Sequence, residues 1–208
     1  MSLKEHIQVT AVDLFSRNGI KRVSMDDVAR KANVSKRTLY DFFKDKEALL
    51  IGVLNKMREP LSEYFESLEK GSYTALEMIL LFNEKLMEKP IWLCEDFLED
   101  IKRFPLAFRL MIDGKRQFLD KIIELLKRGE KESVFMSDIN YDIISLLAHR
   151  QFSKCNSLDI SEVLAKYTPE EVHNTVFYIF LRGICTDAGR DIVDKFVTKK
   201  IYRGYNIR

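Results

Sequence analysis

Apolar residues recur at helical spacing along nearly the whole chain, and this pattern limits the fold more than any other feature. Ile7, Ala11, Leu14 and Phe15 follow the i, i+4, i+7, i+8 spacing that places side chains on one face of an α-helix. The sequence shows no convincing run of alternating apolar and polar residues and no internal repeat. It therefore predicts an all-α protein.

Capping and turn residues predict where the first helices begin and end. Asn18-Gly19 supplies a stop for the first helix, and Ser24 with a carboxylate at Asp27 has the capping-box arrangement of a helix start. Asn33 tolerates a left-handed backbone, and Ser35 can cap the segment that follows. We expect helices near 4–17, 25–31, 36–42, from Asp45 at least to Met57, 73–89, 91–103, 105–128, 138–154 and 169–187, with a possible last one near 189–200.

The four prolines fall at or near the predicted boundaries, where proline is tolerated. They are Pro60, Pro90, Pro105 and Pro169. We therefore expect a helix end or a helix start close to each of them.

Charge is distributed unevenly along the 208 residues. Residues 1–58 carry 12 Lys and Arg against 7 Asp and Glu, a net charge of +5, whereas the remaining residues have a net charge of −3. A basic N-terminal part ahead of a slightly acidic body indicates that the first part meets an anion.

Neither membrane insertion nor secretion is indicated by the sequence. No stretch approaches the ~20 apolar residues that span a bilayer, and the start MSLKEHIQ lacks the apolar segment of a signal peptide. Cys94, Cys155 and Cys185 are widely spaced and form no CxxC pair, so we expect free thiols rather than disulfides or a zinc site. We expect a cytoplasmic protein with no membrane partner.

Residues 25–42 predict two short helices joined by a tight turn. Helices this short are not stable alone, so they must pack on the first helix as a three-helix unit of the helix-turn-helix kind. The same pattern is also compatible with a helical hairpin that has no role in nucleic-acid binding.

The charges at the two helix starts differ. The second helix begins with Asp26 and Asp27, as the helix dipole prefers, whereas the third begins with Lys36, Arg37 and Thr38. Cations at a helix start are unfavourable by ~0.3–1 kcal/mol each, but they suit phosphates and guanine edges in a major groove. The alternative is a solvated face on which Arg37 pairs with Asp41.

The segment SMDDVARKANVSKRTLYDFFKDKEALL closely resembles the N-terminal signature of the TetR family of bacterial transcriptional regulators. The resemblance covers about residues 5–52. Asn33 departs from it where glycine is usual, and Arg37 where a small residue is frequent. Phe42 stands where many relatives have Tyr or His, so a phosphate contact is lost there.

The resemblance implies a DNA-binding domain over residues 1–45 and a helical ligand-binding and dimerisation domain over 46–208. Lys36, Arg37 and Thr38 would face bases or nearby phosphates of a palindromic, double-stranded operator. Tyr40 and Lys46 would hold the DNA backbone, and Ser24 would add a contact. Tyr40 could instead be a core aromatic and Lys46 a plain surface lysine.

The resemblance also implies a homodimer in which helices near 138–154 and 169–187 pair with their mates as a four-helix bundle. The expected interface residues are Ile143, Leu147, Val172, Val176, Ile179, Phe180 and Gly183. An ordinary monomer core would give the same apolar stripes.

Aromatic and apolar residues between the fourth helix and those two helices are candidates for a ligand pocket, although plain packing would also use them. They are Met78, Phe82, Leu86, Trp92, Phe97, Phe104, Phe108, Met111 and Phe118. The expected effector is a small apolar or amphipathic molecule.

The sequence supports neither catalysis nor a cofactor. His6, His149 and His173 are isolated, and no HExxH, GxSxG or glycine-rich phosphate loop occurs. We therefore expect a DNA-binding transcriptional regulator, most simply a repressor, with no catalytic residues, no metal and no cofactor. The alternatives are an all-α interaction protein that keeps the helix-turn-helix as scaffold, and a small helical carrier or enzyme.

Overall fold

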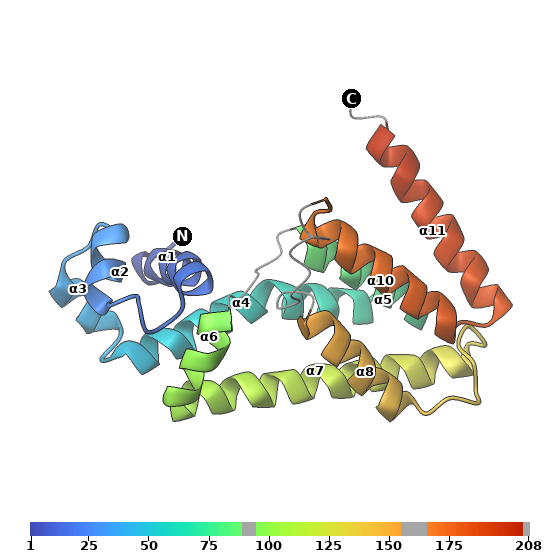
Figure 1. The fold of residues 1–208 in the computed structure, drawn as a ribbon, viewed down its shortest axis with the longest axis horizontal. Helices are drawn as coiled ribbons and strands as arrows, with labels where there is room; N and C mark the ends of the chain where they lie inside the picture. The colour runs from blue at the N-terminus through green and yellow to red at the C-terminus, as the bar shows by residue number, and fades with distance from the viewer. Residues whose placement is uncertain (89–94, 155–165, 206–208) are drawn as a thin grey trace. The chain divides into compact units, whose positions relative to one another are not determined.

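The computed structural model describes residues 1–88, 95–154 and 166–205 (Figure 1). In these ranges every extended element of regular structure is a helix, and a single antiparallel bridge joins Phe135 to Cys185. The all-α prediction is confirmed. The helices are α1 (Leu3–Asn18), α2 (Met25–Lys31), α3 (Lys36–Phe42), α4 (Lys46–Glu69), α5 (Ala75–Glu88), α6 (Glu95–Asp100), the 3-10 turn η1 (Ile101–Arg103), α7 (Pro105–Lys131), α8 (Tyr141–Lys154), α10 (Pro169–Ile184) and α11 (Asp187–Tyr205).

Internal contacts divide the chain into two compact units. We call residues 1–63 and 90–117 the head, and residues 64–89 and 118–208 the body. Helices α4 and α7 each contribute residues to both units. The predicted boundary between residues 45 and 46 stays a prediction, since it falls where α4 begins within the head.

Side-chain caps set the starts of the head helices. Ser24 Oγ accepts the N–H of Asp27, whose carboxylate accepts the N–H of Ser24, so the predicted capping box is present. Ser35 caps α3, and Asp45 Oδ1 accepts the N–H of Ala48 at the start of α4. Asn33 has a φ of 54°, which confirms the predicted left-handed turn between α2 and α3.

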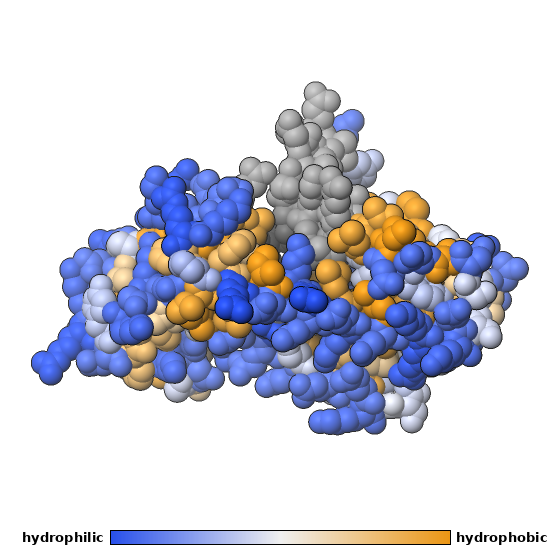
Figure 2. Space-filling model, turned by 90° about the horizontal axis from the view of Figure 1, so that it is seen from below, coloured by the Kyte–Doolittle hydropathy of each residue, from blue (hydrophilic) through white to orange (hydrophobic). Residues whose placement is uncertain are grey.

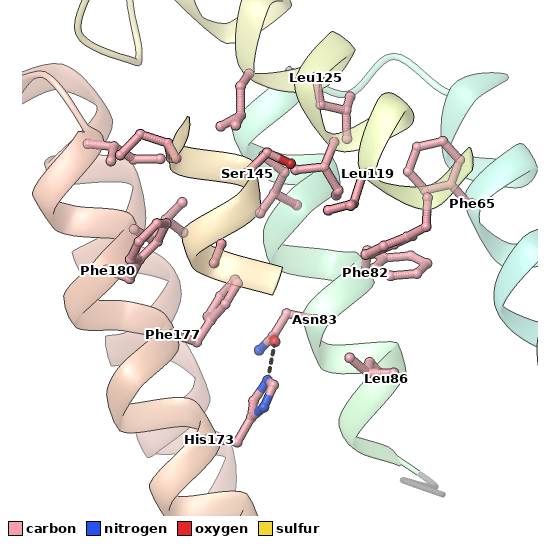
Figure 3. Close-up of a pocket in the computed structure, with 18 residues that line it drawn as sticks. Phe65, Phe82, Asn83, Leu86, Leu119, Leu125, Ser145, His173, Phe177 and Phe180 are labelled. Atoms are coloured by element: carbon pink, nitrogen blue, oxygen red, sulfur yellow. Dashed lines mark hydrogen bonds between the residues drawn. The ribbon is translucent and has the colours of Figure 1, made fainter. Parts of the chain in front are cut away.

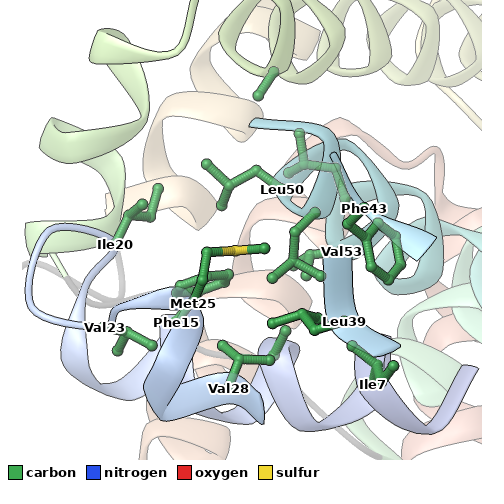
Figure 4. Packing of buried hydrophobic residues seen from close by; sticks show 14 of the residues in the cluster. Ile7, Phe15, Ile20, Val23, Met25, Val28, Leu39, Phe43, Leu50 and Val53 are labelled. Atoms are coloured by element: carbon green, nitrogen blue, oxygen red, sulfur yellow. The ribbon is translucent and has the colours of Figure 1, made fainter. Parts of the chain in front are cut away.

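The two seven-residue helices α2 and α3 are held by packing rather than by their own stability. Their apolar side chains meet those of α1 and α4 in a core shown in Figure 4. The labelled members are Ile7, Phe15, Ile20, Val23, Met25, Val28, Leu39, Phe43, Leu50 and Val53. The result is a three-helix unit packed on the first part of α4.

Two polar contacts tie the rest of the head to this unit. Asp100 Oδ2 accepts the N–H of Lys21, in the turn between α1 and α2, at 2.6 Å. Glu47 Oε1, near the start of α4, accepts the N–H of Leu106 at 2.7 Å and so caps α7. Helix α6 and the start of α7 are therefore fixed to the helix-turn-helix unit.

The body is formed by the end of α4, α5, the later part of α7, α8, α10 and α11. Helix α10 packs on both α8 and α11, and α11 also packs on α5. Gly189 lies against the backbone of Val134, where a Cβ would clash, so α11 begins in close contact with the segment that follows α7.

Several helix boundaries differ from the sequence prediction. Pro60 lies inside α4, so its expected place near a helix end is wrong. Its missing N–H removes only one helical hydrogen bond, and buried residues before and after it hold the helix together. Helix α10 ends at Ile184 rather than near 187, because Cys185 is extended and Thr186 starts α11. The helix expected over 91–103 is described from Glu95, and it tightens to a 3-10 turn at Ile101.

On the face drawn in Figure 2, hydrophilic residues cover most of the surface and hydrophobic residues form patches among them. Within the described ranges, no helix combines the length and the apolar character that crossing a membrane requires.

Candidate nucleic-acid interface and ligand cavity

The start of α3 exposes the basic residues that the sequence assigns to DNA. Lys36 and Arg37 are both exposed on the first turn, beside the N–H groups that the helix leaves free for an anion. Lys36 forms an ion pair with Asp26, whereas no ion pair joins Arg37 to Asp41 among the described residues. The guanidinium of Arg37 is thus available to a partner.

Two hydroxyls of the predicted DNA contacts already have a local role. Ser24 Oγ donates to Asp27 Oδ2 at 2.6 Å, and Thr38 Oγ1 lies 2.7 Å from Ser35 Oγ. The hydrogen bonds from Ser24 lower the pKa of Asp27. These side chains therefore shape the helix starts whether or not DNA is bound.

Tyr40 and Lys46 occupy different environments. Tyr40 is exposed on α3, with nearly half of its surface accessible. Lys46 is half-buried: its Nζ donates to the carbonyl of Ile20 at 2.5 Å and lies 5.8 Å from the centroid of the Phe15 ring. Burial lowers the pKa of this ammonium. Lys46 therefore joins the start of α4 to the turn after α1.

A cavity of about 150 Å³ lies inside the body. Helices α4, α5, α7, α8 and α10 supply its walls, which are almost entirely apolar (Figure 3). The lining residues are Phe65, Ile79, Phe82, Asn83, Leu86, Phe118, Leu119, Ile122, Leu125, Leu126, Ile144, Ser145, Ala148, His173, Phe177, Phe180, Leu181 and Ile184.

Aromatic rings contact one another along one wall of the cavity. Phe82 lies edge-on to Phe65, with ring centroids 5.6 Å apart, and 5.7 Å from the ring of Phe118. The ammonium of Lys121 lies 4.5 Å from the centroid of the Phe65 ring. One ring in this cluster therefore already has a cation on its face.

Three buried polar side chains interrupt the apolar lining. His173 Nε2 lies 2.9 Å from Asn83 Oδ1, and Asn83 Nδ2 donates to Asn174 Oδ1 at 3.3 Å. An amide oxygen can only accept, so His173 donates from Nε2. Ser145 is 2% exposed, and its Oγ has no hydrogen-bond partner among the described residues.

The predicted pocket residues separate into two groups in the structure. Phe82, Leu86 and Phe118 line the cavity, and Met78 is buried in the body away from its wall. Four others pack into the head core, because α6 and the start of α7 belong to that unit: Phe97, Phe104, Phe108 and Met111. Trp92 lies outside the described residues.

Sequence reasoning missed Phe65 and all three polar residues of the cavity. A signal was present at Asn83, which falls on the apolar stripe of α5 four residues after Ile79 and three before Leu86. A polar residue on a buried stripe needs a partner, which makes it a candidate binding group. His173 has the same position on α10, four residues before Phe177.

Most of the predicted dimer residues lie on the outer faces of α8 and α10. Ile143, Leu147 and Ile179 are exposed, at 56%, 50% and 66%. Val172 and Val176 are half-buried, Phe180 lines the cavity, and Gly183 is exposed with open space where a Cβ would be.

Of the three cysteines, only Cys185 lies within the described residues, where it is a buried free thiol. Burial raises its pKa to about 11, so the thiol stays protonated near neutral pH. This position indicates packing rather than redox chemistry.

Comparison with known proteins identifies the head. Residues 7–53 match the family model described as bacterial regulatory proteins, tetR family. The HTH-type transcriptional regulator QacR of Staphylococcus aureus is 31% identical over 84 residues, which cover 40% of this chain and 45% of QacR. The chain matches less than half the length of the curated relatives.

Solved structures extend the likeness of fold to the body. The ketosteroid transcriptional regulator KstR2 of Mycobacterium tuberculosis is 19% identical, with a TM-score of 0.64, over 89% of this chain and 96% of that one. A gamma-butyrolactone receptor (ArpA-like protein) is 17% identical, with a TM-score of 0.74, over 95% of both chains. Residues 7–53 of this chain thus match the tetR family of bacterial regulatory proteins, and the described fold resembles that of these solved structures.

Proposed function

We propose that this protein is a transcriptional repressor that binds operator DNA as a homodimer and is released by a small apolar or amphipathic ligand. The observation that carries the DNA-binding part is the exposed basic start of α3, where Arg37 forms no ion pair among the described residues. A guanidinium there can bond a guanine edge in the major groove, while Lys36 can exchange its partner Asp26 for a phosphate.

A binding selection on random DNA duplexes tests this role. Arg37→Ala should cost about 1–3 kcal/mol of affinity and relax the preference at one base position, because a base contact carries sequence information. Arg17→Ala removes the same charge from α1, where Arg17 pairs with Asp13, and serves as the control. Equal loss of preference in the two variants would contradict the assignment.

The dimer is proposed from the apolar stripes on α8 and α10. Ile143 and Leu147 are one helical turn apart, and Val172, Val176 and Ile179 follow the same spacing on α10, so each helix has an outer apolar stripe besides the side that lines the cavity. Such a patch in a helical protein fits a two-fold interface that joins two palindromic half-sites.

Sedimentation tests this interface. Gly183→Arg should shift the protein toward monomer, since it places an unpaired charge on the proposed contact. Ser67→Arg adds the same charge at an exposed position of α4 and should leave the dimer intact. A Gly183→Arg protein that stays fully dimeric would rule out this face.

Ligand release is proposed from the cavity and from the two helices that belong to both units. Phe65 of α4 and Phe118 of α7 line the cavity, and the same two helices start in the head, where Glu47 of α4 caps α7. A ligand that displaces either helix in the body therefore acts on an element that also carries the reading helix. A coupling of about 1–3 kcal/mol is enough for release.

A further inference from the structure

We propose that the effector is a neutral compound of one aromatic ring carrying a single hydrogen-bonding group, with Ser145 as the partner of that group. This inference rests on the proposed function for the ligand's role as effector. Its chemistry, however, is argued from the cavity alone.

The volume of the cavity sets the size of the ligand. About 150 Å³ lined by Leu, Ile and Phe side chains is the size of cavity that holds one benzene molecule in other proteins. A second fused ring would have to displace wall side chains that pack at interior density. The cavity as it stands therefore selects a single ring.

Ser145 sets the position of the polar group. Its hydroxyl is buried, lines the cavity and has no hydrogen-bond partner among the described residues (Figure 3). Leaving a buried hydroxyl unsatisfied is costly, so a ligand that bonds it gains more than one that does not. A ring hydroxyl can both donate to and accept from this serine.

Asn83 and His173 limit the ligand to one such group. Their side chains are hydrogen-bonded to each other, and Asn83 also bonds Asn174. A second polar group placed on this wall would compete with bonds that the protein already makes. Ser145 therefore offers its hydroxyl to the ligand, Asn83 and His173 already bond each other, and the rest of the lining is apolar.

The absence of ionic groups in the described lining selects a neutral ligand. None of the residues that line the cavity is Lys, Arg, Asp or Glu. Burial of an unpaired ion is costly, and contact of a cation with an aromatic face offsets only part of that cost. Lys121 already occupies a face of Phe65, so a cationic ligand there would also be repelled.

Calorimetry on the full chain with four single-ring probes tests this proposal. The probes are phenol, toluene, protonated benzylamine and benzoate, each titrated into wild type, Ser145→Ala and Ser67→Ala. Ser67 is an exposed serine of α4 outside the cavity, so Ser67→Ala is the matched control. Circular dichroism establishes that both variants are folded.

The expected result has two parts. Phenol binds wild type more tightly than any other probe, and Ser145→Ala weakens phenol by about 3- to 10-fold while leaving toluene unchanged. Ser67→Ala alters neither. A general loss of packing would weaken phenol and toluene together, so the difference between them reports the hydrogen bond.

Other outcomes overturn the proposal. Tighter binding of benzylamine or benzoate, an equal effect of Ser145→Ala on phenol and toluene, or no binding of any probe would each do so. Repeating the phenol titration with bound DNA separates the two claims. If DNA leaves the affinity for phenol unchanged, ligand release is contradicted but the ligand chemistry stands. If DNA changes the affinity for phenol but Ser145→Ala does not, the ligand chemistry is contradicted and ligand release stands.

Discussion

The head and the body are both helical and both bury aromatic side chains, yet their interiors are packed differently. In the head, Ile7, Phe15 and Leu39 are fully buried against one another around short helices. In the body, a cavity of about 150 Å³ remains, with buried Ser145 on its wall. The core of the head is closely packed, whereas the body keeps a cavity with a buried polar group on its wall.

This difference indicates which part of the molecule needs a closely packed core. Helix α3, the proposed reading helix, has seven residues and no stability of its own, so its position depends on complete packing beneath it. The interior of a ligand-binding protein can lack some packing contacts, because a bound ligand makes those contacts and stabilises the folded state. The following variants test this contrast, from the largest expected effect to the smallest.

The same truncation should cost more in the head than on the cavity wall. Leu39→Ala removes a side chain surrounded by core and should lower stability by about 2–5 kcal/mol. Leu125→Ala truncates a buried leucine that already borders the cavity, so fewer contacts are lost and the cost should lie at the low end of that range. Thermal unfolding at one fixed protein concentration measures both. A larger loss for Leu125→Ala would refute the contrast.

Substitution of a larger side chain should destabilise the head more than the cavity wall of the body. Ala29 is buried within the core where α2 packs, and Ala29→Leu should cost about 1–3 kcal/mol through overpacking. Ala148 lines the cavity, so Ala148→Leu can fill space, with stability unchanged or raised and phenol binding lost. Unfolding midpoints and calorimetry report the two effects. If Ala148→Leu destabilises the protein as much as Ala29→Leu does, the cavity is not available space.

Substitutions in the turn between α2 and α3 should change stability only through the backbone conformation that they allow. Asn33 has a positive φ, so Asn33→Ala should cost about 1 kcal/mol, while Asn33→Gly should be nearly neutral. The difference between the two variants in denaturant unfolding isolates the strain. Equal stability of both variants would show that the left-handed turn does not constrain the head.

The sequence predicts those features that depend on neighbouring residues, and not those that depend on packing between distant ones. The bounds of α2 and α3 follow from local caps at Ser24 and Ser35, so sequence alone predicts them. Pro60 was predicted near a helix end, but packing along the rest of α4 overrides this local signal. The helical pattern around a residue does not show into which of the two cores its side chain packs.

The candidate sites follow the same rule. The basic start of α3 is contiguous in sequence, so its residues could be named in advance, although the bond from Lys46 to Ile20 could not. The cavity collects residues from five helices, and aromatic content alone could not separate Phe104 of the head from Phe118 of the body. Buried polar residues at apolar positions, such as Asn83, were the signal that was overlooked.

Occupation of the body cavity is proposed to change the affinity of the head for DNA. The most direct test is to measure ligand affinity with and without the duplex recovered from the binding selection, and duplex affinity with and without ligand. Linkage requires the two factors to be equal, and release requires a factor of roughly 5 to 150. We predict that DNA weakens ligand binding and ligand weakens DNA binding by the same factor within that range, and that Ala148→Leu reduces both factors. A ligand that fills the cavity yet binds free and DNA-bound protein equally well would contradict the account.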